Sequence, residues 1–233
     1  MKMSKKTKVI LYVVLTLVAI YFLFPFVYML LSTFKTEAEA ASFPRTFLPE
    51  NWNWKNFADA WNAQPFGTFF LNSVVVTVLS ALGSMVSCSL VAYGFARFNF
   101  KGKNILFMIL LSTMMIPWDV TMIPQYMEFK AFGWINTLKS LIIPSWFGSA
   151  YYIFLMRQFL MGVPRDFEEA ARIDGANAFQ IFYRIFLPIM KPSLILVGVL
   201  NMLAAWNDYL GPLIFLQDRR GCREIDSSKQ GHI

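Results

Sequence analysis

The sequence is poor in the residues from which most enzymes and metal centres build their sites. It holds a single histidine, His232, and two cysteines, Cys88 and Cys222, with no paired spacing. These numbers argue against a His/Cys metal site and against a disulfide framework. A GxxxxGK[ST] phosphate loop is also absent, so the chain is not itself an ATPase of that kind. With no nucleophile–base pair in view either, we predict no catalytic, cofactor-binding or metal-binding residue.

Charge is equally scarce, because Asp, Glu, Lys and Arg make up 15% of the chain. Soluble domains usually carry about a quarter charged residues, whereas 57% of this chain is hydrophobic. The apolar residues gather in stretches of the roughly 20 residues that cross a bilayer as a helix. We therefore predict an all-α fold, that of a polytopic helical membrane protein in contact with membrane lipid.

Five spans are visible in the hydrophobic pattern. They cover approximately residues 9–31, 68–96, 105–127, 138–160 and 191–215. The net charge of +7 gathers at span ends, before the first span and, with Arg97, Lys101 and Lys103, after the second. By the positive-inside rule, this pattern places the N-terminus and the loop 161–190 in the cytoplasm. Nucleic-acid binding is not predicted, since basic flanks of membrane helices explain the charge.

Two features qualify this pattern of spans. The stretch between the first two spans contains NWNWKNFADAW, whose tryptophans and amphipathic spacing suit a short helix at the membrane interface. The second span is rich in small residues, among them Ser80, Gly83 and Ser84. Small residues let helix backbones approach closely, so we expect this face to pack on another helix.

The most informative segment is the polar run EAARIDGANAFQIFYRIFLP, from Glu169 to Pro188, between the fourth and fifth spans. Acidic residues from Asp166 onward favour the start of a helix. Asp174-Gly175 is expected to end that helix, because glycine readily adopts a positive φ. A second short helix is expected from about Ala176 to Pro188. The pattern predicts a helix–turn–helix within residues 161–190, which we call the elbow.

The two faces of the elbow predict different roles. Phe179, Phe182, Tyr183 and Phe186 follow helical spacing and form an aromatic stripe. We expect this stripe to anchor the elbow onto the membrane helices. The small corner at Gly175-Ala176 can enter a cleft of a soluble partner without a steric or desolvation cost.

This segment resembles the EAA loop of binding-protein-dependent ABC importer permeases. The matching positions are Glu169, Ala170, Ala171, Asp174, Gly175, Ala176, Leu187 and Pro188. The resemblance extends through TMMIPWDVTMIPQY, GWINTLKSLIIP and NDYLGPLIF, and it covers roughly residues 9 to 217. These segments are similar to the carbohydrate-uptake branch of the family, in particular to the smaller partner of a maltose-type or glycerol-phosphate-type pair.

The resemblance implies a transport subunit, not an enzyme, in the cytoplasmic (inner) membrane of a bacterium or archaeon. The matching elbow residues would dock on a cytoplasmic ABC ATPase dimer, and ATP would be bound there and not by this chain. Closure of that dimer would rock the membrane helices between inward-open and outward-open states. An extracytoplasmic solute-binding protein would deliver a sugar or sugar-like solute. A second permease subunit would complete a heterodimer.

Polar residues within the spans leave alternatives open. Asn207 and Asp208 either line the substrate path or, in the case of Asp208, cap a helix break before Gly211-Pro212. A gradient-driven secondary transporter or channel, with Asp119 and Asp208 as its relay, is the alternative function. It is disfavoured because such a carrier needs no docking corner for an ATPase.

The resemblance stops after Gln217. Residues 218–233 read DRRGCREIDSSKQGHI, and their low hydrophobicity and high charge predict a disordered tail that is foreign to the fold. The family has six spans in its core, and the sixth is missing here. A naturally shortened permease and a truncated or frameshifted gene both remain open, and the abrupt change of composition favours the second.

Overall fold

The computed structural model describes residues 4–217, which form helices and turns without a β-strand. The predicted all-α membrane fold is therefore confirmed. The predicted tail, residues 218–233, lies outside the described residues. Internal contacts divide the chain into two units, Met1–Phe66 and Gly67–Ile233, and each is described by itself.

The first unit is built on one apolar helix followed by two short ones. Its elements are α1 (Lys5–Ser32), α2 (Glu37–Ala41) and α3 (Lys55–Ala63). Asn56 of α3 donates from Nδ2 to the carbonyls of Thr33 (2.9 Å) and Lys35 (2.7 Å), at the end of α1. The Phe34 ring lies 4.8 Å from that of Trp54 and 5.4 Å from that of Phe57. The predicted short helix thus forms and is fastened to the turn after α1.

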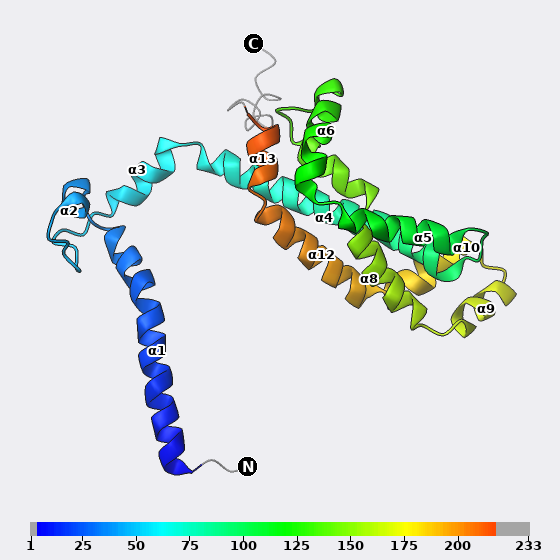
Figure 1. Cartoon of the computed structure of the whole chain (residues 1–233), viewed down its shortest axis with the longest axis horizontal. Helices are drawn as coiled ribbons and strands as arrows, with labels where there is room; N and C mark the ends of the chain where they lie inside the picture. Colours follow the sequence, from blue (N-terminus) through cyan, green and yellow to red (C-terminus); the bar gives the residue numbers. More distant parts are fainter. Residues whose placement is uncertain (1–3, 218–233) are drawn as a thin grey trace. The chain divides into compact units, whose positions relative to one another are not determined.

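The second unit contains the remaining helices (Figure 1). They are α4 (Phe66–Arg97), α5 (Lys103–Ser112), η1 (Thr113–Met115), α6 (Trp118–Ala131), α7 (Lys139–Ile142), η2 (Ile143–Phe147), α8 (Ala150–Met161), α9 (Asp166–Ile173), α10 (Ala178–Ile181), η3 (Phe182–Phe186), α11 (Leu187–Ile189), α12 (Lys191–Trp206) and α13 (Leu210–Phe215). The core lies among α4, α8, α12 and the elbow, where Met156, Leu160, Phe186 and Val197 are fully buried.

Three of the predicted spans are interrupted in the structure. Within the residues described, α1 and α4 are long and apolar enough to cross a membrane alone, and two bent pairs raise that number to 4 if each pair is one span. The segment predicted as the third span bends by 98° before Trp118. Pro117 explains the bend, since Ile116 before it is extended. Pro124, by contrast, lies inside the continuous α6. The five-span topology stays a prediction.

The interruption in the fourth predicted span is supported by α4. Three α4 side chains, spaced four residues apart, contact backbone groups of this segment that have the same spacing. Ser80 Oγ donates to the Leu141 carbonyl (3.4 Å), and Ser84 Oγ donates to the Ser145 carbonyl (3.2 Å). Cys88 Sγ accepts from the Ser149 amide (3.3 Å). Backbone that leaves the α-helical pattern inside a membrane must find such partners within the protein. The small-residue face of α4 therefore packs on a neighbouring segment, as expected.

Gly83 allows this close approach. A Cβ at this position would lie 2.6 Å from Cγ of Trp146 in η2, whereas a Cβ at Gly94 of the same helix would meet nothing within 4 Å. We expect Gly83→Ala to displace the indole and to destabilise the fold by about 1–3 kcal/mol. Gly94→Ala is the matched control and should be neutral or slightly stabilising. Thermal unfolding of both variants in detergent, followed by tryptophan fluorescence, checks the expectation. Equal melting temperatures would contradict it.

Candidate functional site

The first arm of the elbow is a helix with a strong stop. Asp166, Glu168 and Glu169 occupy the first turn of α9, where carboxylates interact favourably with the helix dipole. At the other end, Gly175 has a φ of 79°. Its amide donates to the Arg172 carbonyl (3.1 Å), and the next amide, of Ala176, donates to the Ala171 carbonyl (3.0 Å). This pair of bonds is a Schellman motif, which requires the left-handed residue that glycine supplies.

The second arm begins with a capping box. The side chain of Asn177 accepts from the amide of Gln180 (2.9 Å), and the side chain of Gln180 accepts from the amide of Asn177 (2.9 Å). The helix thus starts at Ala178, slightly later than predicted, and continues through a π-helical turn, η3.

The prediction that Pro188 ends the second arm is wrong by a short distance. Pro188 lies in the first turn of α11, where the amide hydrogen that proline lacks is not needed. The bend follows instead at Met190, where the axes of the helical segments Ala178–Ile189 and Lys191–Trp206 turn by 75°.

The aromatic stripe divides into a buried half and an exposed half. The rings of Phe182 and Phe186 lie 5.1 and 5.3 Å from the ring of Tyr93 in α4. Phe179 and Tyr183 remain 70% and 63% exposed. Two of the four members of the stripe, Phe182 and Phe186, therefore anchor the elbow. The prediction that the whole stripe is an anchor is wrong.

The structure gathers most of the predicted docking residues at the corner of the elbow. Glu169, Ala170, Asp174 and Gly175 are exposed and Ala176 is half-buried, while Ala171 is buried under the corner. Leu187 and Pro188 lie apart from the corner, at the end of the second arm. Sequence reasoning missed Ile173, which is 87% exposed beside the corner. A large aliphatic residue directly before Asp-Gly was the available signal.

Arg97 fastens the elbow to the helix ends beneath it. This residue is only 6% exposed, and its Nη2 donates to the carbonyls of Leu160 (2.6 Å) and Val163 (2.8 Å) after α8. Its guanidinium carbon lies 4.5 Å from the centre of the Phe186 ring. The sequence analysis counted Arg97 only as a cation that orients the helix. Its place directly after the small, buried positions of α4 was a signal for a structural role.

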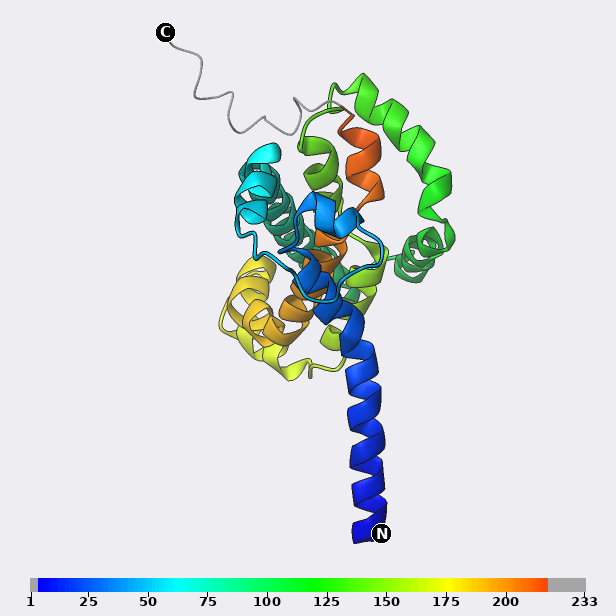
Figure 2. The ribbon, with the colours of Figure 1, turned by 90° about the vertical axis from the view of Figure 1, so that its left-hand side faces the viewer.

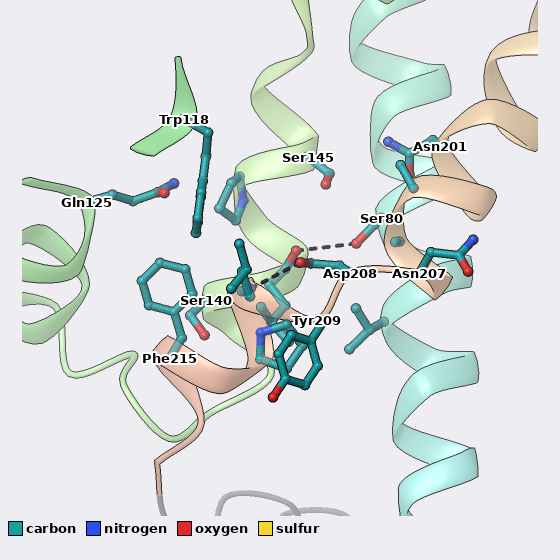
Figure 3. Close-up of a pocket in the computed structure, with 18 residues that line it drawn as sticks. Ser80, Trp118, Gln125, Ser140, Ser145, Asn201, Asn207, Asp208, Tyr209 and Phe215 are labelled. Atoms are coloured by element: carbon teal, nitrogen blue, oxygen red, sulfur yellow. Dashed lines mark hydrogen bonds between the residues drawn. The ribbon is translucent and has the colours of Figure 1, made fainter. Parts of the chain in front are cut away.

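A pocket of about 590 Å³ lies at the end of α12 that is farther from the elbow (Figure 3). Figures 1 and 2 show the ribbon of α12 between the elbow and α13. Its polar and aromatic lining comes from α4, α6, α7, η2, α12 and the turn before α13: Ser80, Trp118, Gln125, Ser140, Ser145, Asn201, Asn207, Asp208 and Tyr209. In Figure 3, Trp118 and Gln125 lie on one side and Asn201 and Asn207 on the other, with Asp208 between. Among the residues described, no group of His, Cys, Asp or Glu is placed to hold a metal ion.

Asp208 lines this pocket and also forms the helix cap that the sequence offered for it, while its place on a substrate path stays a prediction. Its Oδ1 accepts from the amide of Gly211 (3.1 Å) in the first turn of α13. A Cβ at Gly211 would clash with this carboxylate, so the cap depends on the glycine. Asn207, its neighbour, lines the same pocket and donates from Nδ2 to the Leu203 carbonyl (2.8 Å). Asp119 is exposed in the first turn of α6 and is absent from the lining.

One side of the pocket is held by a chain of hydrogen bonds across three elements. Asn201 of α12 donates from Nδ2 to Ser84 Oγ (2.9 Å) of α4. Ser84 in turn donates to the Ser145 carbonyl (3.2 Å) of η2. The Asn201 side-chain amide and the Ser145 carbonyl, which border the pocket, are thus held in place by hydrogen bonds to Ser84. A polar, uncharged solute could form hydrogen bonds with them.

Comparisons with known proteins agree on one family. Residues 85–220 match the family described as "Binding-protein-dependent transport system inner membrane component". The chain is 34% identical over 214 residues to the probable ABC transporter permease protein YurM of Bacillus subtilis (strain 168), and the match covers 91% of this chain and 70% of YurM.

A second relative and a solved structure extend the agreement. The diacetylchitobiose uptake system permease protein NgcG of Streptomyces coelicolor is 33% identical, with 84% of this chain and 65% of NgcG covered. The fold is that of a chain in the crystal structure of a bacterial ABC transporter involved in the import of the acidic polysaccharide alginate. That match has a TM-score of 0.80 at 23% identity and covers 100% of this chain and 85% of the other.

Proposed function

The chain belongs to the family of binding-protein-dependent transport system inner membrane components, and on this premise we propose that it imports a sugar or sugar-like solute. It is a permease subunit of an ABC importer and not the catalytic ATPase. The observation that carries the proposal is the elbow. Its corner is small, exposed and held by a Schellman motif and a capping box, which is the rigid form that a docking element needs.

The elbow residues are proposed as the contact with the ATPase. Glu169, Ala170, Asp174, Gly175 and Ala176 would enter a groove of that subunit, with Ala171 supporting them from below. Leu187 and Pro188 would set the angle between the elbow and α12. Because the aromatic anchor and Arg97 join the elbow to α4 and α8, a displacement of the docked corner would be passed to those helices.

The pocket is proposed to lie on the substrate path, with Asn207 and Asp208 in its wall. Its lining is largely apolar, and amide, hydroxyl and indole groups are set within it. This combination suits the hydroxyls and the apolar faces of a sugar. The relative NgcG, a diacetylchitobiose uptake system permease protein, supports the same class of solute.

Orientation and partners follow from the family and the charge pattern. A binding-protein-dependent importer works with an ATPase and a solute-binding protein. We place the N-terminus and the elbow in the cytoplasm and the pocket toward the outer face. The second permease subunit is proposed to be a different chain, which would make the membrane part a heterodimer.

Transport in proteoliposomes tests this function. The chain would be co-purified with its partner permease and ATPase, and uptake of labelled oligosaccharides would be measured with the binding protein outside and ATP inside. We expect uptake that needs ATP and survives an ionophore that collapses ion gradients. Uptake that follows an imposed ion gradient without ATP would instead establish the gradient-driven alternative.

Asp208 separates these functions at the level of one residue. Asparagine is as good a helix cap as aspartate, so Asp208→Asn is expected to keep uptake within about twofold of wild type. Asp208→Ala loses the cap, which is worth about 1 kcal/mol, and should lower uptake by about fivefold or more. Initial rates of ATP-driven uptake check both values. A complete loss with asparagine would show that the charge itself is required, as in an ion relay.

A further inference from the structure

A second polar pocket lies at the elbow end of the second unit, in the turn between α4 and α5. It has a volume of about 470 Å³ and is lined by Asn99, Phe100, Gly102, Lys103, Asn104, Ile105 and Arg157. This lining contains two cations and no carboxylate. Lys103 and Arg157 are both half-buried, and Lys101, which is exposed, lies in the same turn.

The two cations are held by neutral groups. Lys103 Nζ donates to the Phe98 carbonyl (2.8 Å). Arg157 donates from Nε to the Phe95 carbonyl (3.5 Å), and its guanidinium carbon lies 4.1 Å from the centre of the Phe107 ring. Within residues 4–217, Arg172 forms an ion pair with Glu168, whereas neither Lys103 nor Arg157 pairs with an acidic side chain. Two like charges that share a half-buried pocket repel each other, and a bound anion would offset that repulsion.

The surface next to this pocket is apolar. α5 begins at the pocket, and its side chains Ile105, Leu106, Met108 and Ile109 are between 51% and 61% exposed. A free phosphate ion would use the cations alone. A molecule with an anionic head and an aliphatic tail would use both the pocket and the exposed face of α5, so the arrangement favours an amphiphile.

We propose that this pocket binds the phosphate of an anionic phospholipid headgroup, with Lys103 and Arg157 as its ligands and the acyl chains along α5. Basic pockets at the ends of membrane helices recognise such headgroups, and each Lys or Arg near the surface contributes severalfold to the affinity. The site is separate from both the docking corner and the sugar pocket. It would make the stability of the elbow end depend on the lipid composition of the membrane.

Lipid retention by the purified chain tests the site. The chain would be exchanged into detergent with phosphatidylglycerol or with phosphatidylcholine, and bound lipid would be counted by native mass spectrometry. We expect wild type to retain phosphatidylglycerol preferentially. Lys103→Gln should lower that retention about fivefold, and the double variant with Arg157→Gln should lower it about thirtyfold. Lys103→Arg keeps the charge and should bind as wild type does. Lys139→Gln removes an exposed cation elsewhere and is the matched control.

Inorganic phosphate, added in a separate arm, distinguishes the two sources of the phosphate group. If inorganic phosphate at millimolar concentration does not reduce the retention of phosphatidylglycerol, the result supports a lipid site. Displacement by inorganic phosphate would overturn it in favour of a free-anion site. Equal retention by wild type and Lys103→Gln would show that the pocket is not the site. Loss of bound lipid when the partner permease is added would also overturn the proposal, because it would show that α5 faces that subunit and not the lipid.

Discussion

Gly175→Trp is expected to abolish capture of the ATPase subunit while the permease remains folded and inserted in the membrane. Gly175 has a φ of 79°, and a Cβ there would meet nothing within 4 Å. An indole at this corner therefore projects outward, into the space that the ATPase would occupy, and does not disturb the core of the permease. Blocking a central, fully desolvated contact costs at least about 2 kcal/mol, or roughly thirtyfold in affinity. Co-purification from membranes measures the loss.

Two control variants separate bulk from backbone strain. Gly175→Ala puts a side chain at the same positive φ without filling the docking space, so it reports the strain alone. Gly133→Trp puts an indole at a second glycine with a positive φ, 67°, and with nothing within 4 Å, but outside the elbow. We expect Gly133→Trp to capture the ATPase as wild type does. Normal capture by Gly175→Trp would count directly against docking through the elbow.

The form of the elbow was predictable because its signals are local. Acidic residues at a helix start, Asp-Gly at its stop and aromatic residues at helical spacing act over a few positions. The structure accordingly places the helix, the left-handed Gly175 and the second arm where the sequence analysis expected them. The second arm starts later than predicted because Asn177 and Gln180 form a capping box. The sequence pattern alone does not show whether the helix begins at this box or directly after Gly175.

The arrangement of the spans was less predictable, for a physical reason. Hydrophobicity indicates that a segment prefers lipid, but it does not show where the backbone leaves the helix. The turn at Gly148, with a φ of 84°, is accommodated because α4 side chains contact the backbone around it from 61 positions away in the sequence, through Ser84 to the Ser145 carbonyl and Cys88 to the Ser149 amide. Pro117 bends its segment and Pro124 does not, since a proline breaks a helix only where the surrounding packing accepts the bend.

Replacing Arg97 by lysine is expected to weaken the attachment of the elbow to α4. The Arg97 Nη2 donates to the Leu160 carbonyl in the last turn of α8 and to the Val163 carbonyl just after that helix, and the same guanidinium covers Phe186. A lysine is shorter and has no planar guanidinium, so Arg97→Lys is expected to reach at most one of the two carbonyls and to lose the stacking on the ring. Losing one charged hydrogen bond and the ring contact is expected to cost about 3 kcal/mol. Opening of the elbow from α4 should then become roughly a hundredfold more frequent.

Hydrogen exchange of the amides in α9 and α10 measures this opening. We expect exchange in these segments to accelerate in Arg97→Lys, while exchange in α12 and near the pocket lined by Asp208 stays as in wild type. Arg157→Lys is the matched control, because Arg157 also covers a phenylalanine, Phe107 of α5, and its Nε donates to the Phe95 carbonyl of α4. Faster exchange throughout the second unit would show that Arg97 supports the whole fold. Unchanged exchange would show that Tyr93 and the buried aromatics hold the elbow without Arg97.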